Sequence, residues 1–94
     1  MNVKQAVKTA MEHVADVYSE ENISHIGLEE VEYDEPTAQW NVTVGFARKW
    51  DIPHPAHIPA FVPLRPNNRT YKIVVIRDSD GQVTAMKIRE LAAS

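Results

Sequence analysis

The chain has 94 residues, a formal net charge of −3 and no cysteine. A chain of this length buries only about 60 to 65% of its unfolded surface, which suffices for one hydrophobic core, so we expect a single domain over residues 1–94. The lack of cysteine excludes a disulfide framework, a thiolate nucleophile and a thiolate metal ligand.

Charge and hydropathy exclude further classes of protein. The N-terminal segment lacks the apolar core of a signal peptide, and no run approaches the roughly 20 apolar residues of a membrane span, so we expect a cytoplasmic protein without membrane contact. Basic residues alternate with apolar positions rather than clustering, which argues against nucleic-acid binding. Residues 1–47 carry two lysines and nine acids, whereas residues 48–94 carry eight Lys and Arg and four acids. We expect these halves to attract each other within the fold.

Residues 2 to 21 have the periodicity of an amphipathic helix. Asn2 is suited to cap its start, and Asn22 is suited to a left-handed conformation at its end. Carboxylates toward its C-terminal end oppose the helix dipole, so tertiary packing has to hold it. Its apolar stripe comprises Val3, Ala6, Val7, Ala10, Met11, Val14, Val17 and Tyr18.

Two strands are predicted next. In Ser24 to Tyr33 the apolar alternation changes phase between Leu28 and Val31, which predicts a β-bulge near Glu29 and Glu30. Ala38 to Arg48 alternates regularly, and its inward face points at the helix. That face comprises Trp40, Val42, Val44 and Phe46, while Asn41, Thr43 and Gly45 point outward.

A β-hairpin closes the domain. The apolar run from Tyr71 to Arg77 ends in Asp78-Ser79-Asp80-Gly81, where Gly81 supplies the positive φ of the turn. Because the third strand is apolar on both faces, we expect it to be central, or its outer face to be covered by the preceding loop or another subunit. The fourth strand, Gln82 to Arg89, is expected to place three side chains inward, namely Thr84, Met86 and Ile88.

The segment from Trp50 to Asn68 interrupts this pattern. It holds five of the six prolines, so it forms a stiff connection without regular structure. Long loops of this kind are usually functional or disordered, and this one is too apolar for a simple linker, so we expect it to pack over the sheet or to bind a partner. Its candidate binding residues are Trp50, His54, His57, Ile58, Phe61, Leu64 and Arg65.

Signals for chemistry are weak. His54 and His57 have a spacing that allows a shared metal, but two imidazoles are not a site, so we predict no metal and no cofactor. Asp78, Asp80 and Gly81 resemble the opening of a calcium loop without its closing glutamate, and they are explained by the hairpin turn. The acidic patch in the first strand is best explained as a solvated edge that resists aggregation. It comprises Glu29, Glu30, Glu32, Asp34 and Glu35.

In order of elements, residues 3–89 resemble PepSY-like domains, which consist of a helix followed by antiparallel strands with an Asp…Gly turn. Two stretches carry the resemblance: Trp40-Asn-Val-Thr-Val-Gly-Phe46, and the hairpin from Tyr71 to Val83. Gas-vesicle accessory proteins and uncharacterised small bacterial domains have a similar layout. The resemblance implies a non-enzymatic binding or regulatory role.

These patterns together predict an α+β fold. We expect one N-terminal helix packed on a four-stranded antiparallel meander, with the proline-rich loop between the second and third strands. We expect a non-catalytic protein-interaction or regulatory module with a protein partner, and a homodimer formed through the sheet face. The alternative is a small-ligand or metal-binding protein, or an enzyme, that uses the acidic strand and the loop histidines.

Overall fold

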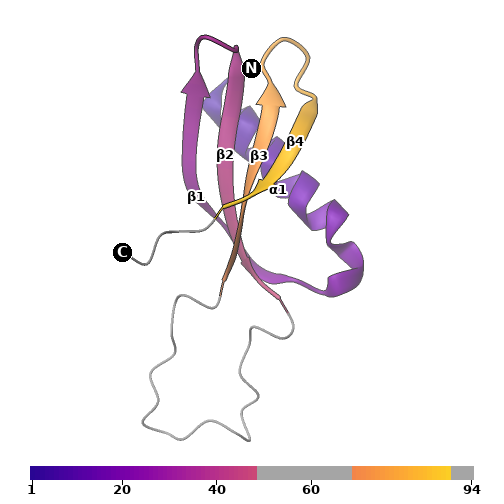
Figure 1. Cartoon of the computed structure of the whole chain (residues 1–94). Coiled ribbons are helices and arrows are strands. Elements are labelled where there is room, and N and C mark those ends of the chain that lie inside the picture. Colours follow the sequence, from indigo (N-terminus) through magenta and orange to yellow (C-terminus); the bar gives the residue numbers. More distant parts are fainter. Residues whose placement is uncertain (49–68, 90–94) are drawn as a thin grey trace, which may run out of the picture.

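One helix crosses one face of a four-stranded antiparallel sheet (Figure 1). The computed structural model describes residues 1–48 and 69–89. The sheet order β1-β2-β3-β4 follows the chain, which confirms the predicted α+β meander. The proline-rich connection between β2 and β3 falls outside the described residues. The elements are α1 (Val3–Val17), the 3-10 helix η1 (Ser19–Glu21), β1 (Ser24–Asp34), β2 (Gln39–Ala47), β3 (Thr70–Arg77) and β4 (Val83–Ile88).

Local side-chain chemistry determines where α1 begins and ends. The Asn2 side chain accepts a hydrogen bond from the Gln5 backbone at 2.9 Å, and the Gln5 side chain accepts one from the Asn2 backbone at 2.8 Å, which forms a capping box. The helix ends at Val17, earlier than predicted, and the next residues form η1 before Asn22 turns left-handed at φ 50°. Glutamates in this last stretch oppose the helix dipole, which is consistent with the early end.

The core lies between α1 and the sheet. Small side chains at Ala6 and Ala10 are fully buried and let the helix backbone approach the strands closely. At the end of α1, the Tyr18 ring lies 4.9 Å from the Phe46 ring, centroid to centroid. Val3 and Val17, at the ends of the predicted stripe, are 46% and 49% exposed. The buried core consists of Ala6, Ala10, Val14, Tyr18, Val42, Val44, Phe46, Val74 and Ile76.

The bulge predicted in the first strand is present. Leu28 pairs with Val44 and Glu30 with Thr43, so one residue of β1 has no counterpart in β2. This shift returns Val31 to the helix side, where it packs against the core. A bulge also bends an edge strand and makes it a poorer template for pairing with another chain.

The β3–β4 hairpin turns at Gly81, which has φ 69° as predicted. The expected inward face of β4 is wrong at two positions. Ile76 pairs with Val83 and Val75 with Ala85, so Thr84 is an extra, exposed residue. Val83 packs against the core instead, and Met86 packs there as predicted. Ile88 lies at the end of the strand and is 74% exposed.

Replacing Phe46 by alanine tests the core. We expect Phe46→Ala to lower the free energy of unfolding by about 3 to 5 kcal/mol, because the ring is fully buried and lies against Tyr18. Urea titration followed by circular dichroism measures this change. Val17→Ala is the control, and its effect should stay within about 0.5 kcal/mol because Val17 is half exposed. Similar losses in both variants would contradict this packing.

Candidate functional site

The predicted binding residues of the proline-rich segment lie outside the described residues. Their role therefore stays a prediction. This applies to Trp50, His54, His57, Ile58, Phe61, Leu64 and Arg65. The described part of the chain presents three other surfaces: the sheet face opposite α1, a groove between α1 and β1, and a hollow beside the β3–β4 turn.

We call the sheet face opposite α1 the open face. All four strands or their ends contribute to it, and it contains a shallow depression of about 240 Å³. Thr43 and Val75 at its centre are almost fully buried, with 2% and 5% exposed. The sequence correctly placed Thr43 on this side but did not reveal that it is buried. The depression is lined by Glu30, Glu32, Asn41, Thr43, Ile73, Val75, Lys87 and Arg89.

Arg89 reaches across the open face. Its backbone donates to the Tyr71 carbonyl at 3.1 Å, which extends the β3–β4 pairing beyond Ile88. Its guanidinium donates to Glu30 at 2.7 Å and to the Thr43 hydroxyl at 3.0 Å. The Glu30 carboxylate thereby raises the pKa of Arg89. Because both side chains are partly in water, this ion pair orients groups more than it stabilises the fold.

Charge on the open face is divided between its two edges. The β1 edge carries the carboxylates of Glu30 and Glu32, and the β4 edge carries Lys87, while Arg89 extends from the end of β4 across the face to Glu30. Within residues 1–48 and 69–89, neither Glu32 nor Lys87 takes part in an ion pair. Opposite charges are thus available at opposite edges of the same face.

Gly45 makes room for side chains on this face. A Cβ at this position would lie 2.9 Å from a Glu29 carboxylate oxygen and 3.0 Å from the Tyr71 ring. Glu29 in turn lies 3.9 Å from the guanidinium of Arg69. Together with the Arg89–Glu30 pair, this contact confirms the predicted attraction between the acidic and basic halves. The glycine itself was the only available sequence signal for this close approach.

A groove between α1 and β1 forms the second surface. Its lining is almost entirely apolar, and its volume is about 400 Å³. Val3 and Leu28 leave 46% and 45% of their surfaces exposed there. Lys4 and Lys8 flank Val7 beside it.

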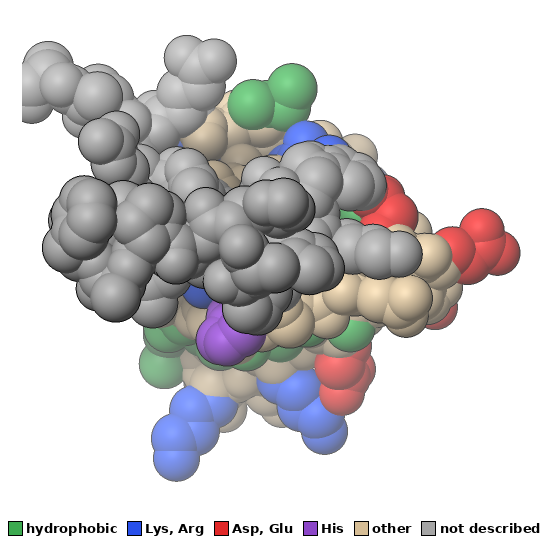
Figure 2. All heavy atoms as spheres, turned by 90° about the horizontal axis from the view of Figure 1, so that it is seen from below, with side chains coloured by type: hydrophobic (Ala, Val, Ile, Leu, Met, Phe, Trp, Pro, Cys, Tyr) green, Lys and Arg blue, Asp and Glu red, His purple; other side chains and the backbone are tan. Residues whose placement is uncertain are grey.

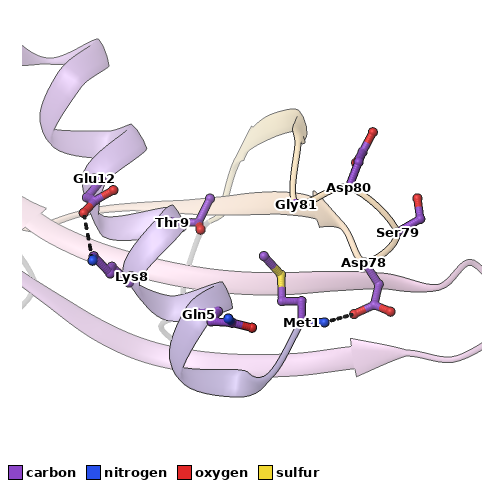
Figure 3. A pocket seen from close by; sticks show the side chains of 9 residues that line it. All are labelled: Met1, Gln5, Lys8, Thr9, Glu12, Asp78, Ser79, Asp80 and Gly81. Atoms are coloured by element: carbon purple, nitrogen blue, oxygen red, sulfur yellow. Dashed lines mark ion pairs between the residues drawn. The ribbon is translucent and has the colours of Figure 1, made fainter.

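The third surface is a hollow of about 530 Å³ between the start of α1 and the β3–β4 turn (Figure 3). The Asp78 carboxylate is turned toward Met1 and accepts a hydrogen bond from the Trp40 indole at 2.9 Å, whereas Asp80 points away from Met1. Asp80 accepts hydrogen bonds from Arg77 at 2.8 Å and from the Gln82 backbone at 3.1 Å. The Asp80 carboxylate therefore serves the hairpin turn, as predicted, whereas the Asp78 carboxylate joins the turn to β2 and to the start of α1.

The described residues contain no group of three or more His, Asp or Glu side chains that could hold a metal ion. Viewed from the end where β2 stops and β3 starts, Asp and Glu side chains lie on the side of the molecule at which α1 ends (Figure 2). This acidic side is distinct from the open face, because η1 and the end of α1 carry it. The described carboxylates on this acidic side do not form a cation-binding site.

Comparison of the chain with protein-family profiles, curated proteins and solved structures finds no match. In the parts of the chain that the structure describes, no helix has the length and apolar character needed to cross a membrane. The geometry of the three described surfaces is therefore the basis for assigning a function to the chain.

The turn carboxylate predicts a pH effect on stability. Hydrogen bonds from the Gln82 backbone and from Arg77, with desolvation opposing them, lower the pKa of Asp80 below 3.8. A pKa lowered by folding adds stability that is complete above the unfolded-state value and is lost as pH falls through the folded-state value. Asp80→Asn should therefore lower Tm at pH 7 and lower it less near about pH 2.5.

Thermal melts followed by circular dichroism at both pH values measure this difference. Asp16→Asn is the matched control, because Asp16 is exposed on α1 and its side chain makes none of the ion pairs or hydrogen bonds described above. An equal Tm loss for Asp80→Asn at both pH values would contradict a role for the Asp80 charge.

Proposed function

We propose that the chain is a non-catalytic protein-interaction or regulatory module and that its docking surface is the open face. The observation that carries this proposal is a strip of neutral side chains, crossed by Arg89, between the acidic β1 edge and Lys87 on β4, on the face that α1 leaves uncovered. The strip is formed by Asn41, Thr43, Ile73, Val75 and Ala85.

A strip of short side chains suits the stacking of a second sheet. Packed sheets lie about 10 Å apart, a distance that β-branched side chains from both sides fill. Ile73 on β3 provides a partly accessible β-branched side chain at the centre of the face, whereas Thr43 and Val75 beside it are already almost fully buried. A second copy of the chain presents the same strip, so a homodimer through the sheet face is the assembly that we propose.

Further parts of this proposal come from the sequence. The stiff, apolar segment from residue 49 to residue 68 is proposed to bind a protein partner, because a proline-rich segment loses less entropy on binding than a flexible one. The resemblance to PepSY-like domains agrees with a regulatory role in which no catalytic group takes part. A cytoplasmic location is proposed on the composition alone.

The alternative of a small-ligand or metal-binding protein, or of an enzyme, would use the acidic strand and the loop histidines. In the described structure, Glu30 is already bound by Arg89, and Glu29 lies beside Arg69. Carboxylates neutralised in this way are poor candidates for acid–base work or metal ligation. No described contact therefore favours the alternative over the interaction module.

Ile73→Glu tests the open face. Its side chain is half-buried at the centre of the depression, so a carboxylate there would have to be desolvated on docking of a second sheet. We expect the wild-type chain to form dimers at high concentration and Ile73→Glu to associate at least about tenfold more weakly. Sedimentation equilibrium over a range of protein concentrations measures both.

Val17→Glu is the control, because it introduces the same carboxylate in place of a β-branched side chain at an exposed position on α1, away from the open face. Circular dichroism should show that both variants are folded. Undiminished association of Ile73→Glu would refute the open face as the docking surface, and a wild-type chain that stays monomeric would refute self-association.

A further inference from the structure

The order of charges across the open face favours one orientation of a second copy. We infer that two copies stack face to face about a twofold axis parallel to the strands, with the β1 edge of each over the β4 edge of the other. This inference rests on the proposed self-association and adds its geometry.

Strand register places opposite charges at the two ends of one row. Glu30 pairs with Thr43, Thr43 with Ile73, and Ile73 with Lys87, so this row runs from a carboxylate on β1 to an ammonium on β4. Glu32 lies two residues further along the β1 edge, a distance of about 7 Å, which a long side chain can span. Within each copy, Arg89 spans the face to Glu30, whereas Glu32 and Lys87 lie at opposite edges, on β1 and β4.

Two symmetric arrangements are open to a pair of stacked sheets. An axis parallel to the strands brings the β1 edge of one copy over the β4 edge of its partner, so carboxylates face cations at both margins. An axis in the plane of the sheet but perpendicular to the strands brings each edge over its own counterpart, so carboxylates face carboxylates. Both keep the strands aligned, as packed sheets prefer, so backbone geometry does not choose between them.

The charges at the two edges favour one of these two axes. Like charges opposed across an interface disfavour association, whereas opposite charges favour it and fix its register. Glu30 is already paired with Arg89 inside each copy. Within the described residues Glu32 and Lys87 form no ion pair, although the charge of Glu32 also acts on Arg89 through space. These two side chains are therefore the groups whose charges the second copy would meet, and each occurs twice in the symmetric dimer.

A charge-swap series tests the axis. We expect Glu32→Lys and Lys87→Glu each to weaken the dimer about tenfold, because each change turns two attractions into two repulsions. The double variant with both changes should recover wild-type affinity to within about threefold, since its charges are merely exchanged. Sedimentation equilibrium at low ionic strength, where screening is weak, measures all four affinities.

The perpendicular axis leads to a different pattern. Each edge would then face its own counterpart, and like charges would meet whichever sign positions 32 and 87 carry, so all four proteins would dimerise with similar affinity. That result would overturn the inferred geometry while leaving the proposed function intact. Failure of the double variant to recover would overturn it as well, and so would a wild-type chain that stays monomeric, which would also contradict the proposed self-association.

Lys4→Glu is the control for a general effect of net charge. It makes the same charge change as Lys87→Glu at an exposed position on α1. Its dimer affinity should match that of the wild type, and a loss equal to that of Lys87→Glu would contradict the assigned role of Lys87. Thermal melts of each variant should show that the fold persists.

Discussion

The structure depends on the close packing of α1 against the inner face of the sheet. Alanines at positions 6 and 10 let the helix lie near β2 and β3, and Val14 and Tyr18 then fill the space above Phe46. Because the helix ends carry charges that oppose its dipole, this burial rather than local helix preference has to hold it in place. Among the described residues, α1 covers only the inner face, and the open face is the consequence.

Electrostatic contacts between the two halves of the chain add to the packing of the buried side chains. The acidic β1 edge meets the basic second half of the chain at Glu30 with Arg89 and at Glu29 with Arg69. Charged side chains and two register shifts make β1 a poor edge for pairing with another strand. Association of copies through their faces is thus compatible with this sheet, whereas association through the β1 edge is disfavoured.

The surfaces differ in what they can offer a partner. The hollow beside the β3–β4 turn is lined by carboxylates that already have donors, and its role is structural. The groove between α1 and β1 is more apolar and leaves Leu28 accessible. Of these three surfaces, only the open face has a centre of neutral side chains between oppositely charged edges. This combination provides contact area and fixes the register of two symmetric copies.

Much of the local structure followed from the sequence because it depends on neighbouring residues. Asn2 caps α1, Gly81 takes the positive φ of the hairpin, and the change of phase after Leu28 marks a bulge. The inward set of β2 followed equally from the two-residue period of a strand. The binding residues predicted between 49 and 68 lie outside the described structure, so this part of the site stays a prediction.

Tertiary structure decided what depends on register between distant segments. The register shift opposite Val75 turns Thr84 outward and brings Val83 in, an outcome that strand alternation alone predicts wrongly. Arg89 contacts Glu30 and Thr43, which lie 59 and 46 positions away in the sequence. The space that Gly45 leaves is occupied by the side chains of Glu29 and Tyr71, which only the strand register brings beside it. The sequence by itself determined the order of the elements and the inward face of β2, because propensity and periodicity are local. Only the assembled sheet decided which charges share a face, because that depends on the pairing of all four strands.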